Sequence, residues 1–175
     1  MQGDLNGRID LIVDGGAVAV GVESTIVGCF ETPMLLRPGR LPREAIERVL
    51  GRRLAGVPEH ASQDSGHDSA APLAPGMLAS HYAPRTPVRL DAARIEADEA
   101  LLAFGPLMVA GSEGAKVVMN LSTSGDLNEA AANLFGYLRM LDTSGAHTIA
   151  VMPVPHHGLG EAINDRLRRA AIGLA

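Results

Sequence analysis

Residues 117–141, VVMNLSTSGDLNEAAANLFGYLRML, decide the fold of this chain because they join a strand pattern to a helix pattern. The first five residues are mostly apolar and suit a short buried strand. Asp126, followed three residues later by Glu129, predicts the start of a helix. Apolar side chains then recur at helical spacing, at Leu127, Ala131, Leu134, Leu138 and Leu141. A strand that leads into an amphipathic helix indicates an α/β domain.

The same alternation continues on both sides of this stretch. Short apolar runs predict further strands at residues 88–90, 101–104 and 149–152. A last helix is predicted by the helical spacing of Ile163, Leu167, Ala170 and Leu174. Strands that alternate with helices favour a parallel sheet with right-handed crossovers. We therefore expect a small α/β domain over residues 87–175.

The N-terminal residues predict a smaller piece of sheet. Strands are expected at Ile9–Val13, along 18–28 and at Met34–Leu36, with the polar triplet Glu23-Ser24-Thr25 inside the second strand. Pro42 opens a helix whose inward, apolar face consists of Ile46, Val49 and Leu50. About 55 residues bury too little surface for an independent domain, and their sheet has open edges. Either a second chain completes this piece, for instance in a homodimer, or it belongs to a larger domain.

Residues 56–86 are typical of a linker that contains one chemically unusual segment. The first part, 56–73, is rich in Gly, Pro, Ser and Asp and has no periodicity. The segment APGMLASHYAP at 74–84 holds a turn signal at Pro75-Gly76 and then Met77, His81 and Tyr82. Flexibility alone does not require a methionine, a histidine and a tyrosine in so short a space. The segment is either an ordered tether on a domain surface or a lid that folds over a ligand.

The composition describes a chain whose core is built from aliphatic side chains. Hydrophobic residues make up 46% of the 175 residues, whereas aromatic residues make up 3% and tryptophan is absent. The single cysteine, Cys29, excludes an internal disulfide, fits a reducing compartment and is expected to be buried on its strand. No apolar run approaches the length of a membrane span, and the N-terminus lacks a signal-peptide pattern. We expect a soluble cytoplasmic protein.

The charge pattern leaves RNA binding as one alternative function. The formal net charge of −5 argues against a broad nucleic-acid-binding face. A local basic face stays open, because residues 37–53 contain six arginines against two glutamates. A second basic group falls in the C-terminal half of the last helix, where cations suit the helix dipole, at Arg166, Arg168 and Arg169.

Three polar residues at predicted strands are candidate ligand-binding groups. The hydroxyls of Ser24 and Thr25 either bind a small polar ligand or make ordinary cross-strand hydrogen bonds. Arg37 ends the third predicted strand. There its guanidinium either binds a phosphate or carboxylate in bidentate fashion or is an ordinary surface group. Residue type and position alone do not decide between these alternatives.

Two motifs before the last helix are weak signals. Gly158-Leu159-Gly160 resembles part of a dinucleotide fingerprint, but the third glycine is missing and Glu161 would repel a phosphate. His156-His157 has only Glu161 nearby at ligand spacing, which favours a solvated pair over a metal site. We expect neither a nucleotide site nor a metal site here.

Taken in order along the chain, several motifs resemble the Sua5 family. The ordered series covers nearly the whole chain apart from the linker, and it is far more specific than any single motif. It consists of Asp14-Gly15-Gly16, Gly21-Val22-Glu23-Ser24-Thr25-Ile26-Val27, Leu35-Leu36-Arg37-Pro38-Gly39, Ala74-Pro75-Gly76-Met77, His81-Tyr82-Ala83-Pro84, Gly158-Leu159-Gly160-Glu161-Ala162-Ile163 and Asp165-Arg166-Leu167.

The resemblance implies a nucleotidyltransferase that makes L-threonylcarbamoyl-AMP from L-threonine, bicarbonate and ATP, with Mg²⁺ accompanying the ATP. Downstream tRNA-pathway enzymes use this product to form threonylcarbamoyladenosine (t6A) next to the anticodon. By resemblance, Ser24 and Thr25 would meet threonine or the intermediate, and Arg37 would meet the nucleotide phosphates. The residues that would close over the site are Gly76, Met77, His81 and Tyr82.

The resemblance also implies how the chain is divided. Residues 1–55 would be the C-terminal portion of a YrdC-like catalytic α/β domain, 56–86 the linker with its lid, and 87–175 a Rossmann-like Sua5 domain. The family's YrdC-like domain begins before residue 1, and its basic opening and nucleotide loop have no counterpart here. We therefore assign no catalytic residue and expect the chain to be incomplete as an enzyme by itself. The alternatives are a non-catalytic nucleotide-binding or regulatory module, or an RNA-binding protein of translation.

Overall fold

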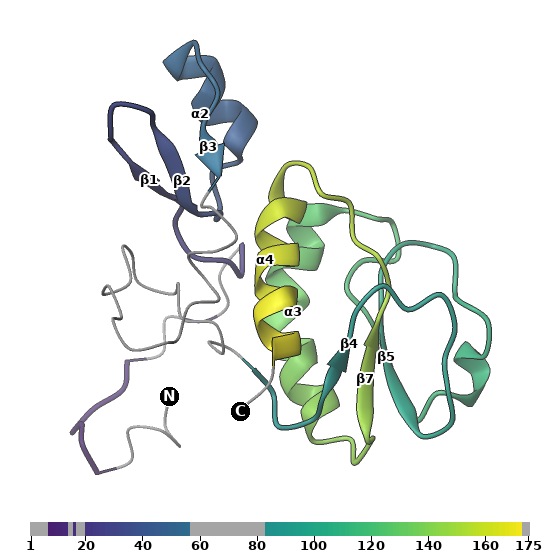
Figure 1. Ribbon diagram of the computed structural model, residues 1–175. Helices are drawn as coiled ribbons and strands as arrows, with labels where there is room; N and C mark the ends of the chain where they lie inside the picture. The colour runs from purple at the N-terminus through teal and green to yellow at the C-terminus, as the bar shows by residue number, and fades with distance from the viewer. Residues whose placement is uncertain (1–6, 14–15, 17–19, 57–82, 173–175) are drawn as a thin grey trace, which may run out of the picture.

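A small three-stranded sheet forms the first part of the computed structural model, which describes residues 7–13, 16, 20–56 and 83–172 (Figure 1). The sheet consists of β1 (Ile26–Gly28), β2 (Met34–Arg37) and β3 (Ala55–Gly56), in the order β1-β2-β3. β1 and β2 are antiparallel, whereas β2 and β3 are parallel. α2 (Arg43–Leu50) connects β2 to β3 and ends at Gly51, whose φ of 67° is readily adopted by glycine.

The second sheet is parallel throughout. Its strands are β4 (Val88–Arg89), β5 (Glu99–Ala103), β6 (Val118–Asn120) and β7 (Thr148–Val151), in the order β4-β7-β5-β6. α3 (Leu127–Asp142) follows β6, and α4 (Leu159–Ile172) follows β7. Both helices lie on the same face of the sheet, and a short 3₁₀ helix, η2 (Ser112–Gly114), lies in the connection from β5 to β6 (Figure 1). The predicted α/β class is confirmed, as are the four strands predicted for this half.

The start of α3 is fixed by hydrogen bonds that the sequence predicted only in part. The Asp126 carboxylate accepts from the backbone N–H groups of Asn128 and Glu129, as an N-cap does. Glu129 does not complete a reciprocal capping box, because its carboxylate instead accepts a hydrogen bond from the Ser122 hydroxyl at 2.5 Å. The apolar face of the helix is buried against the sheet at Ala130, Ala131, Leu134, Leu138 and Leu141.

Residues 20–22 connect the two parts of the molecule, because they pack against α3. Val22 is 6% exposed and belongs to the same core cluster as the buried face of α3. Gly21 permits this close approach, since a Cβ at that position would lie 2.3 Å from the carbonyl oxygen of Ala131. The segment that leads to the candidate site is thus part of the core of the second half.

Two of the strand predictions for the N-terminal part are wrong. Ile9–Val13 forms no strand and is exposed, because none of the described strands pairs with it. Of the second predicted strand, 18 and 19 lie outside the described residues; over 20–28 only β1 is a strand, and Glu23-Ser24-Thr25 precedes it. The backbone at Glu23 bonds elsewhere: its carbonyl accepts a hydrogen bond from the Arg40 N–H at 2.9 Å.

Two burial predictions in this part are also wrong. Val49 is 87% exposed and Leu50 is 43% exposed, because no described residue covers that face of α2. Cys29 is exposed, since it follows the last residue of β1 and lies outside the ladder. The apolar periodicity of α2 correctly indicated a helix, but periodicity does not show what covers a helix.

Candidate functional site

A cleft of about 900 Å³ lies where the residues before β1 face the start of α2. Clefts of this volume are typical of small-molecule sites. Its walls are mostly apolar, with two hydroxyl groups and one guanidinium among them, and it is lined by Val20, Val22, Ser24, Thr25, Val27, Arg40, Leu41 and Ile46. Two of the residues singled out in the sequence, Ser24 and Thr25, are therefore in the wall of one cleft.

Arg37 lies behind this wall and holds Ser24. Its Nε donates to the Ser24 carbonyl oxygen at 3.1 Å, and its Nη2 donates to the Ser24 hydroxyl at 3.1 Å. The residue is 8% exposed, so it is not an ordinary surface arginine. Because Arg37 is at the end of β2 and Ser24 precedes β1, the antiparallel pairing of these strands brings the two together.

The loop after β2 docks on the same segment. The Thr25 hydroxyl donates to the Leu41 carbonyl oxygen at 2.7 Å and accepts from the Leu41 N–H at 3.0 Å. Gly39 allows the two backbones to meet, because a Cβ there would lie 2.3 Å from the Glu23 carbonyl oxygen. The hydroxyl of Thr25 thus fixes the shape of the wall.

Arg40 is a candidate binding residue that the sequence analysis did not single out. It is exposed and lines the cleft, where its guanidinium can meet an anionic group. Its position directly after the Pro38-Gly39 turn is the signal that could have identified it. The other four candidates, Gly76, Met77, His81 and Tyr82, lie outside the described residues.

The electrostatics beside Ser24 are set by Glu23. Burial of this carboxyl favours its neutral form, but the hydrogen bonds from Arg166 and the charges of Arg166 and Arg37 outweigh it, so that the pKa lies below the ordinary value of 4.5. Glu23 is therefore a carboxylate at neutral pH. It pairs with the guanidinium of Arg166 and interacts with the charge of Arg37.

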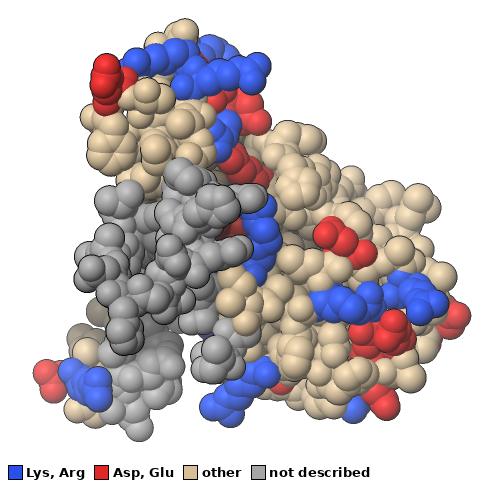
Figure 2. Space-filling view, in the orientation of Figure 1, with Lys and Arg blue, Asp and Glu red and all other residues tan. Residues whose placement is uncertain are grey.

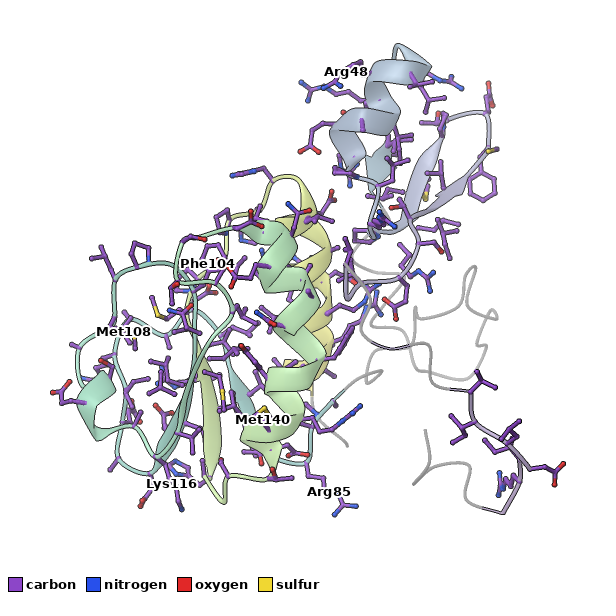
Figure 3. The ribbon with its side chains drawn as sticks, turned by 180° about the vertical axis from the view of Figure 1, so that it is seen from behind. Arg48, Arg85, Phe104, Met108, Lys116 and Met140 are labelled. Atoms are coloured by element: carbon purple, nitrogen blue, oxygen red, sulfur yellow. The ribbon has the colours of Figure 1, made fainter. Side chains whose placement is uncertain are left out.

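The arginines of residues 37–53 do not form one continuous basic face. Arg37 contacts Ser24, and Arg43 forms an ion pair with Glu161 at 2.6 Å. Figure 2 shows basic side chains at the α2 end of the molecule, with acidic side chains beside them. Arg48 projects from α2 into solvent (Figure 3). This division weakens the RNA-binding alternative.

The glycine motif at the start of α4 serves packing. A Cβ on Gly160 would lie 1.8 Å from the Pro155 carbonyl oxygen, and the Gly158 N–H already donates to the Glu44 carboxylate at 3.3 Å. A second hollow nearby measures about 180 Å³ and includes His156 and Arg168, which is below the usual size of a nucleotide-binding pocket. Within the part of the chain that the structure describes, no group of three or more His, Cys, Asp or Glu side chains could hold a metal ion.

The length and hydropathy of the helices also bear on a membrane association. Among the described residues, no helix is both long and apolar enough to cross a membrane.

Comparisons with known proteins agree on one family. Residues 41–172 match the family model for the C-terminal domain of threonylcarbamoyl-AMP synthase. The chain is 35% identical to the threonylcarbamoyl-AMP synthase of Bacillus subtilis and 36% identical to that of Pyrococcus abyssi. These matches cover 97% and 96% of this chain, and 51% of each relative.

A solved structure gives the same result. The crystal structure of P. abyssi Sua5 complexed with L-threonine superposes with a TM-score of 0.77 at 34% identity, over 97% of this chain and 52% of that one. The chain thus spans about half the length of the relatives that it matches. It belongs to the threonylcarbamoyl-AMP synthase (Sua5) family.

Proposed function

We propose that this chain carries one wall of the site at which L-threonylcarbamoyl-AMP is made from L-threonine, bicarbonate and ATP for t6A formation in tRNA. The observation that carries the proposal is the Ser24 hydroxyl, which is held by Arg37 at 3.1 Å in the wall of a cleft of about 900 Å³. The membership of the chain in the family supports this choice of substrates over other small polar ligands.

The reaction places specific demands on this wall. A carboxylate oxygen of threonine carbamate attacks the α-phosphorus of ATP, the bond to the bridging oxygen of the β-phosphate breaks, and pyrophosphate leaves. Negative charge builds on the phosphates, so the protein contributes mainly positioning and charge stabilisation. We assign the binding of threonine or the intermediate to Ser24, and Thr25 shapes the wall. We assign the binding of the phosphates to Arg40, and to Arg37 through its hydrogen bonds to Ser24. Mg²⁺ would enter with the ATP.

The linker residues complete the proposed site. From the resemblance, we propose that Gly76, Met77, His81 and Tyr82 close over the cleft and exclude water from a labile mixed anhydride. A variant of P. abyssi Sua5 in which a neighbouring histidine and tyrosine are replaced by alanine has a solved structure, and His81-Tyr82 is the one such pair in this sequence. The division into residues 1–55, 56–86 and 87–175 remains part of the proposal.

We further propose that the chain is catalytically incomplete by itself. Two observations support this: the chain spans about half of its relatives, and Leu11, Val13 and Val49 are more than three-quarters exposed. Ile9, Leu11, Ile12 and Val13 are exposed within one run, and contiguous exposed apolar residues mark surfaces that another molecule covers. A longer form, a completing chain or a second copy would supply that cover. The expected setting is the cytoplasm, upstream of the enzymes that modify tRNA.

Isothermal titration calorimetry of the whole chain with L-threonine and with ATP tests the site. We expect saturable L-threonine binding that weakens on the order of tenfold in Ser24→Ala, because the variant loses a hydroxyl that Arg37 orients. Ser112→Ala, in η2, is the matched control and should bind as the unaltered chain does. Absence of L-threonine binding would refute the proposal. ATP binding that Ser24→Ala leaves unchanged would favour a nucleotide-binding module with its site elsewhere.

A further inference from the structure

We propose that Arg166 is a positioning residue of the candidate site, through which α4 of the second half sets the geometry of Ser24 and Arg37. The inference rests on the proposed function only for the identity of the ligand. The sequence pattern had placed Arg166 among cations that suit the helix dipole. In the structure it is instead the largest fully buried side chain among the described residues, with 1% of its surface exposed.

The contacts of Arg166 reach both residues that flank the site. Its Nε and Nη2 donate to Glu23 Oε2 at 3.1 and 2.8 Å, and Nη2 also donates to the Pro38 carbonyl oxygen at 3.3 Å. Glu23 directly precedes Ser24, and Pro38 directly follows Arg37. One guanidinium thus ties together the two segments from which the wall is built.

These contacts form a closed ring. Arg166 bonds Glu23, the chain continues to Ser24, Ser24 bonds Arg37, and the chain continues to Pro38, which bonds Arg166 again. A ring of charge-assisted hydrogen bonds restricts each member more than separate pairs would. Arg166 is itself held in place, because Asp165 accepts from its Nη1.

Asp165 is fixed in turn by the next turn of α4. Arg169 donates to both of its carboxylate oxygens, at 3.0 and 3.2 Å. Contacts within its own helix therefore orient the Arg166 guanidinium, in addition to its contact with Glu23. A donor fixed in this way can hold a binding group within a narrow range of positions.

A second ion pair provides the comparison that separates positioning from simple attachment. Arg43 of α2 donates to Glu161 of α4 at 2.6, 3.1 and 3.2 Å, and so joins the same two halves. Both of its side chains are 24% exposed, and neither residue adjoins Ser24 or Arg37 in the sequence. If α4 served only to attach the two halves, the loss of either ion pair would have the same effect on the cleft wall.

Amide hydrogen exchange by NMR on the whole chain, without any ligand, tests the inference. The reporters are the N–H groups of Arg40 and Leu41, which bond Glu23 and Thr25 across the wall, and the Arg37 Nε–H resonance. In Glu23→Gln we expect exchange of both amides to accelerate on the order of tenfold and the Arg37 resonance to shift. In the control Glu161→Gln both amides should stay within about twofold and the Arg37 resonance should be unchanged.

Arg166→Lys adds a test of geometry at constant charge. A lysine ammonium lacks the planar fork that reaches both Glu23 and Pro38, so we expect the same changes as in Glu23→Gln. The inference would be overturned if Glu23→Gln and Glu161→Gln changed amide exchange equally. It would also be overturned if both amides kept full protection in Glu23→Gln and in Arg166→Lys. If Arg166→Lys does not fold, the two glutamate variants decide. L-threonine affinity, measured afterwards, should fall in Glu23→Gln and not in Glu161→Gln.

Discussion

At the scale of single residues, the site depends on how three charges are balanced behind the cleft wall. Glu23 is two-thirds buried, forms an ion pair with Arg166 of α4, and is also influenced by the charge of Arg37, at the end of β2. The net effect lowers the pKa of Glu23, so the folded protein binds a proton at this group less readily than the unfolded chain does. The ion pair therefore stabilises the fold only while Glu23 is ionised.

This balance predicts an acid-dependent contribution to stability. The stabilisation is fully present above the ordinary pKa of 4.5 and is lost as the pH falls through the lower pKa of the folded state. Urea unfolding of the unaltered chain and of Glu23→Gln, from about pH 7 to about pH 3, should therefore show a difference in unfolding free energy that shrinks with acidification. Asp165 also contacts Arg166, but this residue is the same in both proteins. A difference that stays constant or grows would contradict this reading of Glu23.

At the scale of elements, α4 packs against two different parts of the molecule. One face is buried in the core at Ile163, Leu167 and Ala170, while Glu161 and Arg166 contact the first half of the molecule. The N-terminus of the helix is packed against Pro155, which leaves no space for a side chain at Gly160. The conformation around Gly158-Leu159-Gly160 therefore reflects close packing.

A pair of glycine substitutions in helices tests this interpretation. Gly160→Ala should lower the unfolding free energy by roughly 2 kcal/mol or more, because the new Cβ would overlap the backbone of Pro155. Gly136→Ala in α3 is the matched control: nothing lies within 4 Å of its Cβ position, and alanine should raise the unfolding free energy by about 0.5–1 kcal/mol. Both values come from urea denaturation. Similar effects of the two substitutions would contradict the packing role of Gly160.

Local patterns predicted the elements well where the apolar side chains meet a core in the described part of the chain. α3 and the four strands of the parallel sheet follow from periodicity, because their buried faces are packed within this chain. The same reasoning failed for Val49 and Leu50, since an apolar stripe predicts that something covers it and does not say what. It also failed for Ile9–Val13, because a strand needs a partner.

At the scale of the whole molecule, the two sheets lie in different parts of the structure (Figure 1), and the bond from Arg166 to Glu23 links these parts. The order of the motifs indicated the family, whereas the role of Ser24, which lies in the wall of a cleft, stays a prediction. Arg166 could not be predicted from the sequence, because its partner Glu23 is 143 positions away and no local pattern relates them. A buried arginine is also an uncommon outcome for a residue type that is mostly exposed.

The proposal that the chain needs more polypeptide to catalyse the reaction belongs to the same scale. It spans about half of its relatives and presents apolar residues of α2 and of Ile9–Val13 to solvent. The cleft of this chain can bind part of a ligand, but phosphoryl-transfer chemistry requires reactants that are enclosed and aligned. We therefore expect this chain to bind L-threonine without catalysing turnover.

The most direct measurement of that central claim is pyrophosphate release from ATP in the presence of bicarbonate, with and without L-threonine. The chain is assayed alone, beside the full-length Bacillus subtilis relative as a positive control. We expect threonine-dependent release from the relative and none above background from this chain, although we expect the chain to bind L-threonine. Threonine-dependent release by this chain alone, at the rate of the relative, would contradict it.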